Sequence, residues 1–178
     1  MDEHPAAELS YPGAGLTEPA TEPWASTPRE FRRFEATVAI GRGAAAWTFA
    51  TDEVLSWGIK RRSGFRVSPL TITEGLDYRI TVGWGPFTVL EPVRVVAVVD
   101  DVDRCGFAYG TLHGHPVSGE EAFIVHRDPV GTVFLTLRSL TRAAPNGSWR
   151  PAFPVLLLAQ RFARRRYLRS LKCPADPR

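Results

Sequence analysis

The feature that most constrains the fold is a run of strand-like segments between residues 65 and 143, with no helical pattern between them. The segments are rich in β-branched and aromatic residues, and short breakers such as Gly85-Pro86 and Asp100-Asp101 separate them. They span 65–68, 77–85, 87–101, 106–112, 120–128 and 131–143. Parallel neighbours would need long crossover connections, so the short connections predict an antiparallel meander.

Two helical patterns flank this run. Before it, residues 34–40 alternate like a half-buried strand, and residues 44–58 repeat apolar side chains at helical spacing. After it, residues 154–172 predict a long helix whose apolar stripe includes Leu156 and Tyr167. That stripe must be buried, and the predicted sheet is the surface large enough to cover it. We therefore expect an α+β fold in which a curved antiparallel sheet of about six or seven strands grips a long C-terminal helix.

This order of elements resembles the helix-grip architecture of START and Bet v 1-like proteins. The resemblance is one of topology and implies no function. The first 30 residues are rich in Pro, Ala, Glu and Thr and show no periodicity. We expect residues 1–30 to form an extended acidic arm, held by Tyr11 and Trp24, and residues 31–173 to form a single α+β domain.

The net charge of +3 hides an uneven distribution of charged residues. Residues 1–30 carry six acidic side chains against one arginine, whereas residues 161–172 carry six cations and no acid. This basic segment could contact nucleic acid or an anionic surface, or it could be a solvated face that offsets the helix dipole. The arginines considered for such a partner are Arg161, Arg164, Arg165 and Arg169.

The cysteines and the N-terminus bear on cofactors and compartment. Cys105 and Cys173 lie far apart, with no CxxC pair and no histidine at ligand spacing, so they predict two free thiols rather than a zinc site. We expect no metal and no organic cofactor. Without a basic n-region followed by an apolar core, and without a membrane-spanning apolar run, the sequence predicts a cytoplasmic protein.

Glu120 and Glu121 are adjacent carboxylates at the start of a predicted strand. Successive side chains alternate across a strand, so one of the two points inward if one face is covered. The inward residue is Glu121 if Phe123 and Val125 face the core, and Glu120 if Ala122 and Ile124 do. The larger apolar pair favours Glu121, but the sequence leaves both open. A buried carboxylate needs a partner. The candidate partners are Tyr109, His113, His115, Arg94 and Arg138.

Three roles for the inward carboxylate remain open from the residues alone. It could accept backbone hydrogen bonds and shape the loop at 113–119, it could orient or protonate a ligand in a pocket, or it could join His113 and His115 around a metal. For the ligand-binding role, the predicted site residues are Glu121, Glu120, Tyr109, His115, His113, Trp84 and Arg94.

Four motifs together resemble the DUF1990 family, also called UPF0548. They are "LSYPGAGLT" at 9–17, "IGRGAAAW" at 40–47, "GFAYGTLHGHPVSGEEAF" at 106–123 and "QRFARRRYLRSL" at 160–171. The resemblance covers nearly the whole chain but implies no established activity and no catalytic residues. After residue 17 this chain continues with "EPATEPW", which departs from the basic residue and "P.G" phrase usual in the family.

The leading functional hypothesis is a protein that binds a small, largely apolar ligand between the sheet and the C-terminal helix. Glu121, with Tyr109 or His115, would then hold the polar end of the ligand. The alternatives are an enzyme that performs acid/base chemistry in the same pocket, and an interaction module that acts through the arginine-rich helix.

Overall fold

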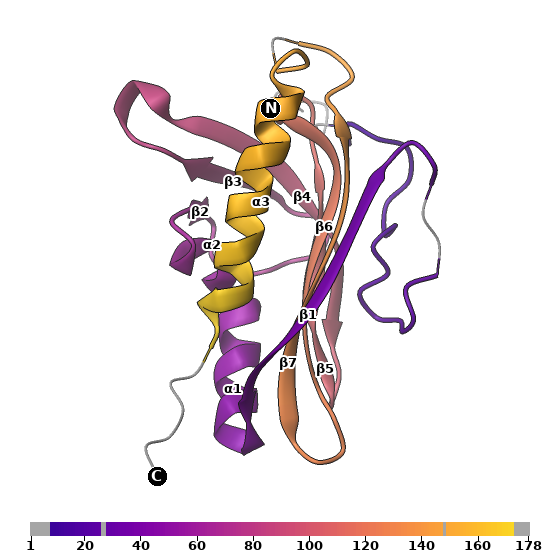
Figure 1. Ribbon diagram of the computed structural model, residues 1–178, viewed down its shortest axis with the longest axis vertical. Coiled ribbons are helices and arrows are strands. Elements are labelled where there is room, and N and C mark those ends of the chain that lie inside the picture. Colours follow the sequence, from indigo (N-terminus) through magenta and orange to yellow (C-terminus); the bar gives the residue numbers. More distant parts are fainter. Residues whose placement is uncertain (1–7, 26–27, 148, 173–178) are drawn as a thin grey trace, which may run out of the picture.

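A computed structural model describes residues 8–25, 28–147 and 149–172, and this part of the chain forms one seven-stranded antiparallel sheet with three α-helices (Figure 1). The strands are β1 (Arg32–Arg42), β2 (Arg66–Ser68), β3 (Asp77–Val82), β4 (Val89–Asp100), β5 (Arg104–Thr111), β6 (Val117–Arg127) and β7 (Thr132–Ala143). Their order in the sheet is β1-β7-β6-β5-β4-β3-β2. The expected antiparallel meander is therefore confirmed from β2 to β7. Strand β1, which precedes the meander in the sequence, pairs with β7 and forms one edge of the sheet.

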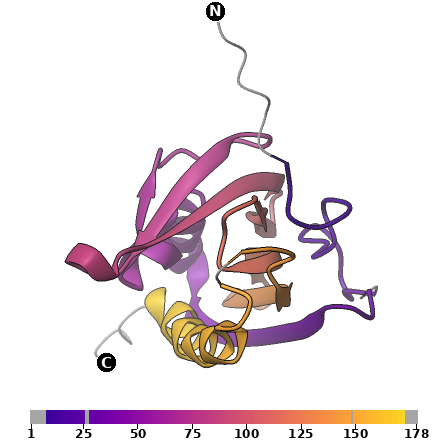
Figure 2. The same ribbon diagram turned by 90° about the horizontal axis from the view of Figure 1, so that it is seen from above.

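All three helices lie on one face of the sheet, which we call the inner face. They are α1 (Gly43–Val54), α2 (Gly58–Arg62) and α3 (Phe153–Ser170). Figure 2 shows the sheet curving around α3. The α+β class and the long C-terminal helix are confirmed, and the arrangement is consistent with a helix-grip-like fold. Within the described ranges, no helix combines the length and the apolar character needed to cross a bilayer.

The helical segment expected over 44–58 is two helices rather than one. The α1 helix ends at Val54, and Trp57 adopts a left-handed backbone conformation with a φ of 59° before α2 begins. The Trp57 ring is buried against Tyr78 and Phe107, with centroid distances of 5.0 and 4.7 Å. Burial of this large ring offsets the unfavourable backbone conformation. As a result the basic stretch that follows is helical, and Lys60 is directed into the protein.

The opposite, outer face of the sheet is covered in part by residues 8–25 of the N-terminal arm, drawn in indigo in Figure 1. Leu9 forms a β-bridge with Leu112, and the side chains of Tyr11 and Trp24 are buried. A Cβ atom at Gly110 would lie 2.2 Å from the Tyr11 hydroxyl oxygen. The glycine is therefore what allows the arm to approach strand β5 this closely.

The main core lies between the inner face and the helices. It contains aromatic and aliphatic side chains from β3 to β7, together with Trp57 and Tyr167 from the helical side. Within it, Phe107 and Phe123 are cross-strand partners on β5 and β6, with ring centroids 5.9 Å apart. Toward the end of the sheet where α3 begins, the space between sheet and helix is not filled, and a cavity remains.

Candidate functional site

The cavity has a volume of about 470 Å³ and lies between the inner face of the sheet, the β3–β4 hairpin and α3. Its walls are mostly apolar. The apolar lining includes Phe65, Val82, Val89, Leu156, Phe162 and Ala163. This size falls in the range of roughly 300–1,000 Å³ that is typical of small-molecule sites.

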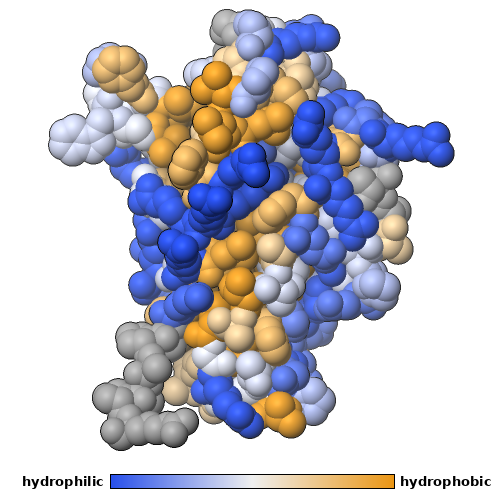
Figure 3. Space-filling model, in the orientation of Figure 1, coloured by the Kyte–Doolittle hydropathy of each residue, from blue (hydrophilic) through white to orange (hydrophobic). Residues whose placement is uncertain are grey.

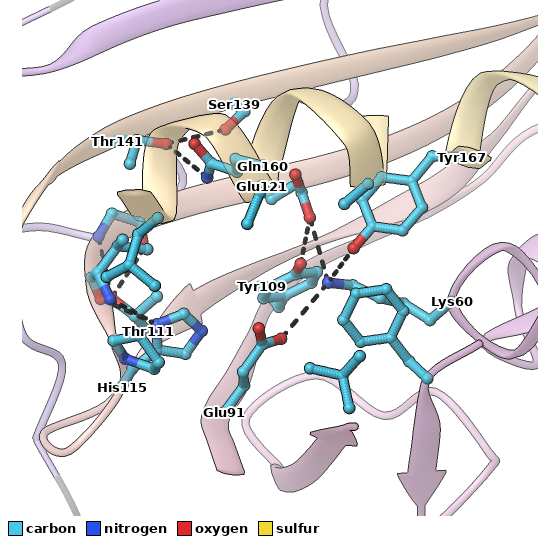
Figure 4. Close-up of a pocket in the computed structure, with 18 of the residues that line it drawn as sticks. Lys60, Glu91, Tyr109, Thr111, His115, Glu121, Ser139, Thr141, Gln160 and Tyr167 are labelled. Carbon is cyan, nitrogen blue, oxygen red and sulfur yellow. Dashed lines mark hydrogen bonds and ion pairs between the residues drawn. The ribbon is translucent and has the colours of Figure 1, made fainter. Parts of the chain in front are cut away.

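A cluster of polar side chains forms one side of the cavity, with Lys60 of α2 at its centre (Figure 4). The Lys60 side chain is only 4% exposed, and its Nζ donates a hydrogen bond of 2.9 Å to the Tyr167 hydroxyl. The same Nζ lies 3.4 Å from a carboxylate oxygen of Glu121 and 3.8 Å from one of Glu91. The Tyr109 hydroxyl donates a hydrogen bond to Glu121. One cation is thus shared by two carboxyl groups and a tyrosine.

Aromatic rings surround the same ammonium group. Nζ of Lys60 lies 4.6 Å from the ring centroid of Phe65, 5.0 Å from that of Tyr109 and 4.9 Å from that of Tyr167. Cation–π attraction adds to the ion pairs and compensates part of the loss of hydration. The cluster is therefore built from α2, α3 and three neighbouring strands around a buried cation.

Glu121 is the inward member of the glutamate pair. It shares the inner face with Phe123 and Val125, which belong to the main core, as the larger apolar pair indicated. Of its candidate partners, Tyr109 contacts it, whereas Arg138 pairs with Glu35 at 2.9 Å and Arg94 pairs with Asp77 at 2.6 Å. Its cationic partner is Lys60, which sequence reasoning did not consider.

The carboxylate of Glu120 lies on the outer face and has a different role. It accepts hydrogen bonds from the Tyr11 hydroxyl at 2.7 Å, from the backbone N–H groups of Gly15, Leu16 and Thr17 at 2.9, 3.1 and 2.7 Å, and from the Thr17 hydroxyl. Glu120 is 2% exposed. It therefore holds the "YPGAGLT" segment of the arm against the sheet rather than facing a ligand.

Burial changes the ionisation of several groups around the cavity. Desolvation raises the pKa of Glu91; the positive charge of Lys60 opposes this shift and the Glu121 carboxylate adds to it. Desolvation is also the main cause that raises the pKa of Tyr109 and of Tyr167 well above the ordinary value, so both are neutral hydroxyl groups. Burial thus shifts Glu91 toward its protonated form, against the attraction of Lys60.

His115 lines the cavity in the loop between β5 and β6. Its Nδ1 lies 2.9 Å from the carbonyl oxygen of Val117 and 3.1 Å from the backbone nitrogen of the same residue. Burial, and secondarily the charge of Lys60, lowers the pKa of His115 from 6.5 to about 3. Folding therefore holds this imidazole in its neutral form.

The low pKa of His115 predicts a loss of stability in acid. Between pH 6.5 and pH 3 the unfolded chain binds a proton at this position that the folded chain does not, so stability falls as pH falls. From pH 7 to pH 5 this site should remove about 2 kcal/mol of unfolding free energy. In urea unfolding, the free energy of unfolding of the wild type should therefore fall further between pH 7 and pH 5 than that of His115→Asn. The control is His113→Asn, which changes an exposed histidine of the same loop and should lose as much stability in acid as the wild type. If His115→Asn and the wild type lose the same amount, the pKa shift does not belong to His115.

Three of the predicted site residues lie outside the cavity. His113 is exposed, Trp84 is 86% exposed at the tip of the β3–β4 hairpin, and Arg94 pairs with Asp77. The structure therefore brings Glu121, Tyr109 and His115 of the predicted set together at the cavity; Glu120 also borders it, but its carboxylate is bound to the arm on the outer face. Across the described residues there is no group of three or more His, Cys, Asp or Glu side chains placed to hold a metal ion. Cys105 is buried with a free thiol, and Cys173 lies outside the described residues.

The arginine-rich helix α3 is not uniformly solvated. Arg164 is partly buried, donates hydrogen bonds to Ser139 at 3.0 Å and Gln160 at 3.2 Å, and its guanidinium carbon lies 4.3 Å from the Phe34 ring centroid. Arg161, Arg165 and Arg169 are exposed. Of the four arginines considered for a partner, Arg164 therefore helps to hold α3 on the sheet.

Sequence reasoning missed Lys60 and Glu91. A signal for Glu91 was present, because it alternates with Val89, Val93 and Val95 along β4 and so faces inward with them. Lys60 carried no such signal, since it stands beside Arg61 in a stretch that resembles an exposed basic turn. Only the turn of the backbone at Trp57 directs it inward.

Comparisons with known proteins identify the same family as the sequence motifs do. The model of the family described as "Domain of unknown function (DUF1990)" matches residues 10–170. A UPF0548 protein of Deinococcus radiodurans is 35% identical over 159 residues, which cover 82% of this chain and 79% of that protein. The crystal structure of a hypothetical protein from Helicobacter pylori matches with a TM-score of 0.53 and 10% identity, over 80% of this chain and 85% of that one, and shows a likeness of fold alone. A crystal structure from Deinococcus radiodurans matches with a TM-score of 0.43 and 20% identity, over 77% of this chain and 98% of that one. The chain belongs to the DUF1990 family.

Proposed function

We propose that this protein binds a small, largely apolar molecule in the cavity between the sheet and α3. The observation that carries the proposal is the cavity itself, about 470 Å³ with mostly apolar walls and a polar cluster around Lys60. Such a combination is typical of sites in which apolar walls supply affinity and a few polar groups fix the orientation of the ligand.

The polar cluster also limits the chemistry of the ligand's polar end. Lys60 is balanced by Glu121, so an anionic head group would meet a carboxylate rather than an uncompensated cation. The Tyr167 hydroxyl accepts a hydrogen bond from Lys60, which leaves its own O–H for donation, and the raised pKa of Glu91 favours a carboxyl that donates. These donors suit an uncharged acceptor such as a carbonyl or hydroxyl oxygen.

A cavity-filling variant tests this proposal. Ala163 of α3 lines the cavity, and Ala163→Trp should fill it, whereas Ala45→Trp adds the same ring on the exposed side of α1. The probe is the uncharged fluorophore N-phenylnaphthylamine, titrated into the purified full-length protein. We expect the wild type and Ala45→Trp to bind it with equal affinity and Ala163→Trp to bind at least about tenfold more weakly.

Native mass spectrometry of the same proteins gives an independent readout. A small molecule released on denaturation from the wild type and Ala45→Trp, and missing from Ala163→Trp, would identify the ligand class. If Ala163→Trp remains folded by circular dichroism and still binds the probe as tightly as the wild type, the cavity is not the binding site.

One observation favours an acid/base enzyme as the second candidate. Burial raises the pKa of Glu91, whose carboxyl group shares Lys60 with the Glu121 carboxylate, so the cavity places a carboxyl group with a raised pKa close to a second one. If the protein transforms its ligand, molecules extracted from the wild type should include a substrate and product pair. Glu91→Gln, which removes the proton donor, should yield the substrate alone. Identical extracts from both proteins would leave binding as the function.

A further inference from the structure

The rim of the cavity carries large apolar side chains that are left in water. Trp84 and Phe87, at the tip of the β3–β4 hairpin, are 86% and 84% exposed. On α3, Val155, Leu158 and Phe162 are 68%, 53% and 57% exposed. Exposed aromatic and aliphatic side chains that gather in one region of a surface mark a site of interaction.

Both groups border the same opening. The hairpin tip lies between Val82 and Val89, which line the cavity from β3 and β4. On α3, Val155, Ala159 and Phe162 recur at i, i+4 and i+7 and so share one side of the helix, and Ala159 and Phe162 line the cavity. Figure 3 shows hydrophobic residues gathered over the N-terminal half of α3 and extending toward the hairpin. We call the exposed side chains Trp84, Phe87, Val155, Leu158 and Phe162 the rim patch.

Positive charge accompanies the rim patch. Arg161 and Arg165 are exposed and follow Leu158 and Phe162 by three residues, which places them beside these side chains on the helix surface. The sequence of α3 contains five arginines and no acidic residue. Figure 3 shows hydrophilic residues in a band directly below the hydrophobic region. Aromatic tips flanked by arginines are complementary to the interface of a bilayer that contains anionic lipid.

We propose that the rim patch docks on the surface of an anionic lipid bilayer, with Trp84 and Phe87 inserted at the head-group boundary and Arg161 and Arg165 against lipid phosphates. In this orientation the mouth of the cavity opens onto the bilayer. If the proposed function holds, a largely apolar ligand can then pass between bilayer and cavity without crossing water. The docking itself rests on the exposed residues and not on the ligand.

The test is flotation of the full-length protein with vesicles. One set contains equimolar phosphatidylcholine and phosphatidylglycerol, and the other contains phosphatidylcholine alone, both at low salt. We expect the wild type to float with the anionic vesicles, to bind the neutral ones more weakly, and to lose binding as salt is raised. The fluorescence of the exposed Trp84 should shift to the blue on binding, because its ring leaves water.

Matched double variants separate docking from a general loss of apolar or positive surface. Trp84→Ser/Phe87→Ser should weaken partitioning at least about tenfold. Val102→Ser/Val130→Ser changes two exposed side chains, 77% and 66% exposed, in turns at the other end of the sheet, and should bind like the wild type.

A second pair of double variants tests the contribution of the arginines in the same way. Arg161→Gln/Arg165→Gln should weaken binding to the anionic vesicles about fivefold for each arginine removed. Arg29→Gln/Arg32→Gln removes the same charge from two exposed residues, one just before β1 and one at its start, and should change binding to the anionic vesicles much less. A smaller salt dependence in the first variant than in the second would support direct contact with lipid phosphates.

Two outcomes overturn the proposal. If the wild type does not float with the anionic vesicles, the rim patch is not a membrane-docking surface. If it floats but the Trp84/Phe87 variant binds as well as the Val102/Val130 variant, another surface makes the contact. The probe titration with Ala163→Trp is independent of both outcomes, since Ala163 lines the cavity and is not part of the rim patch. Failure of docking and failure of ligand binding are therefore distinguishable.

Discussion

Replacing Glu120 by alanine is expected to lower the free energy of unfolding by about 3–5 kcal/mol. The substitution removes the acceptor for the Tyr11 hydroxyl, for three consecutive backbone N–H groups at 15–17 and for the Thr17 hydroxyl. These donors must then stay unpaired under the arm or separate from the sheet, which exposes Tyr11 and Trp24 to water. Urea unfolding followed by tryptophan fluorescence measures the loss.

Two further variants define the cause of that loss. Glu120→Gln keeps an acceptor oxygen but removes the negative charge, so it should fall between the wild type and Glu120→Ala. Glu30→Ala removes an exposed carboxylate near the start of β1 and should leave stability nearly unchanged. Equal stability of Glu120→Ala and Glu30→Ala would show that the arm is not held by this carboxylate.

The second large effect is expected at Lys60. Lys60→Met retains most of the buried volume but removes the cation that Glu121 and Glu91 share, and breaking a buried ion pair from one side costs about 3–5 kcal/mol. Lys172→Met, which changes an exposed lysine after α3, is the matched control. In a double-mutant cycle, Lys60→Met/Glu121→Gln should be less destabilised than the sum of the single variants by about 1–3 kcal/mol. Additive effects would mean that the two groups do not interact.

Lys60→Met should also change how the stability of the protein depends on pH. The pKa of Glu91 is raised from 4.5 by burial, so above pH 4.5 the folded chain holds a proton that the unfolded chain has released, and stability falls as pH rises. Lys60 is the group that opposes this shift. Lys60→Met should therefore lose more stability on going from pH 4.5 toward neutrality than the wild type does. Lys60→Met/Glu91→Gln should not show this added loss.

Strand periodicity accounts for the parts of the site that sequence alone predicted. The segments between 65 and 143 follow one another with short connections, which is enough to specify an antiparallel meander. The same alternation places Glu121 on the face of Phe123 and Val125, beside Tyr109 of the neighbouring strand. The same alternation along β4 also indicates that Glu91 faces inward. These conclusions hold because side-chain direction in a strand depends on local backbone geometry.

Contacts between distant parts of the chain decided the rest. Lys60 enters the cavity because the backbone turns at Trp57, and burial of that ring against strands far along the sequence favours the turn. Glu120 is satisfied by Tyr11, 109 positions away, in a segment without periodicity. Composition and motifs thus identified the family and the sheet. Only the tertiary structure showed that Lys60 is the buried cation and that Trp84 and Phe87 remain in water at the cavity rim. The reason is that the burial of a residue depends on every element that packs around it.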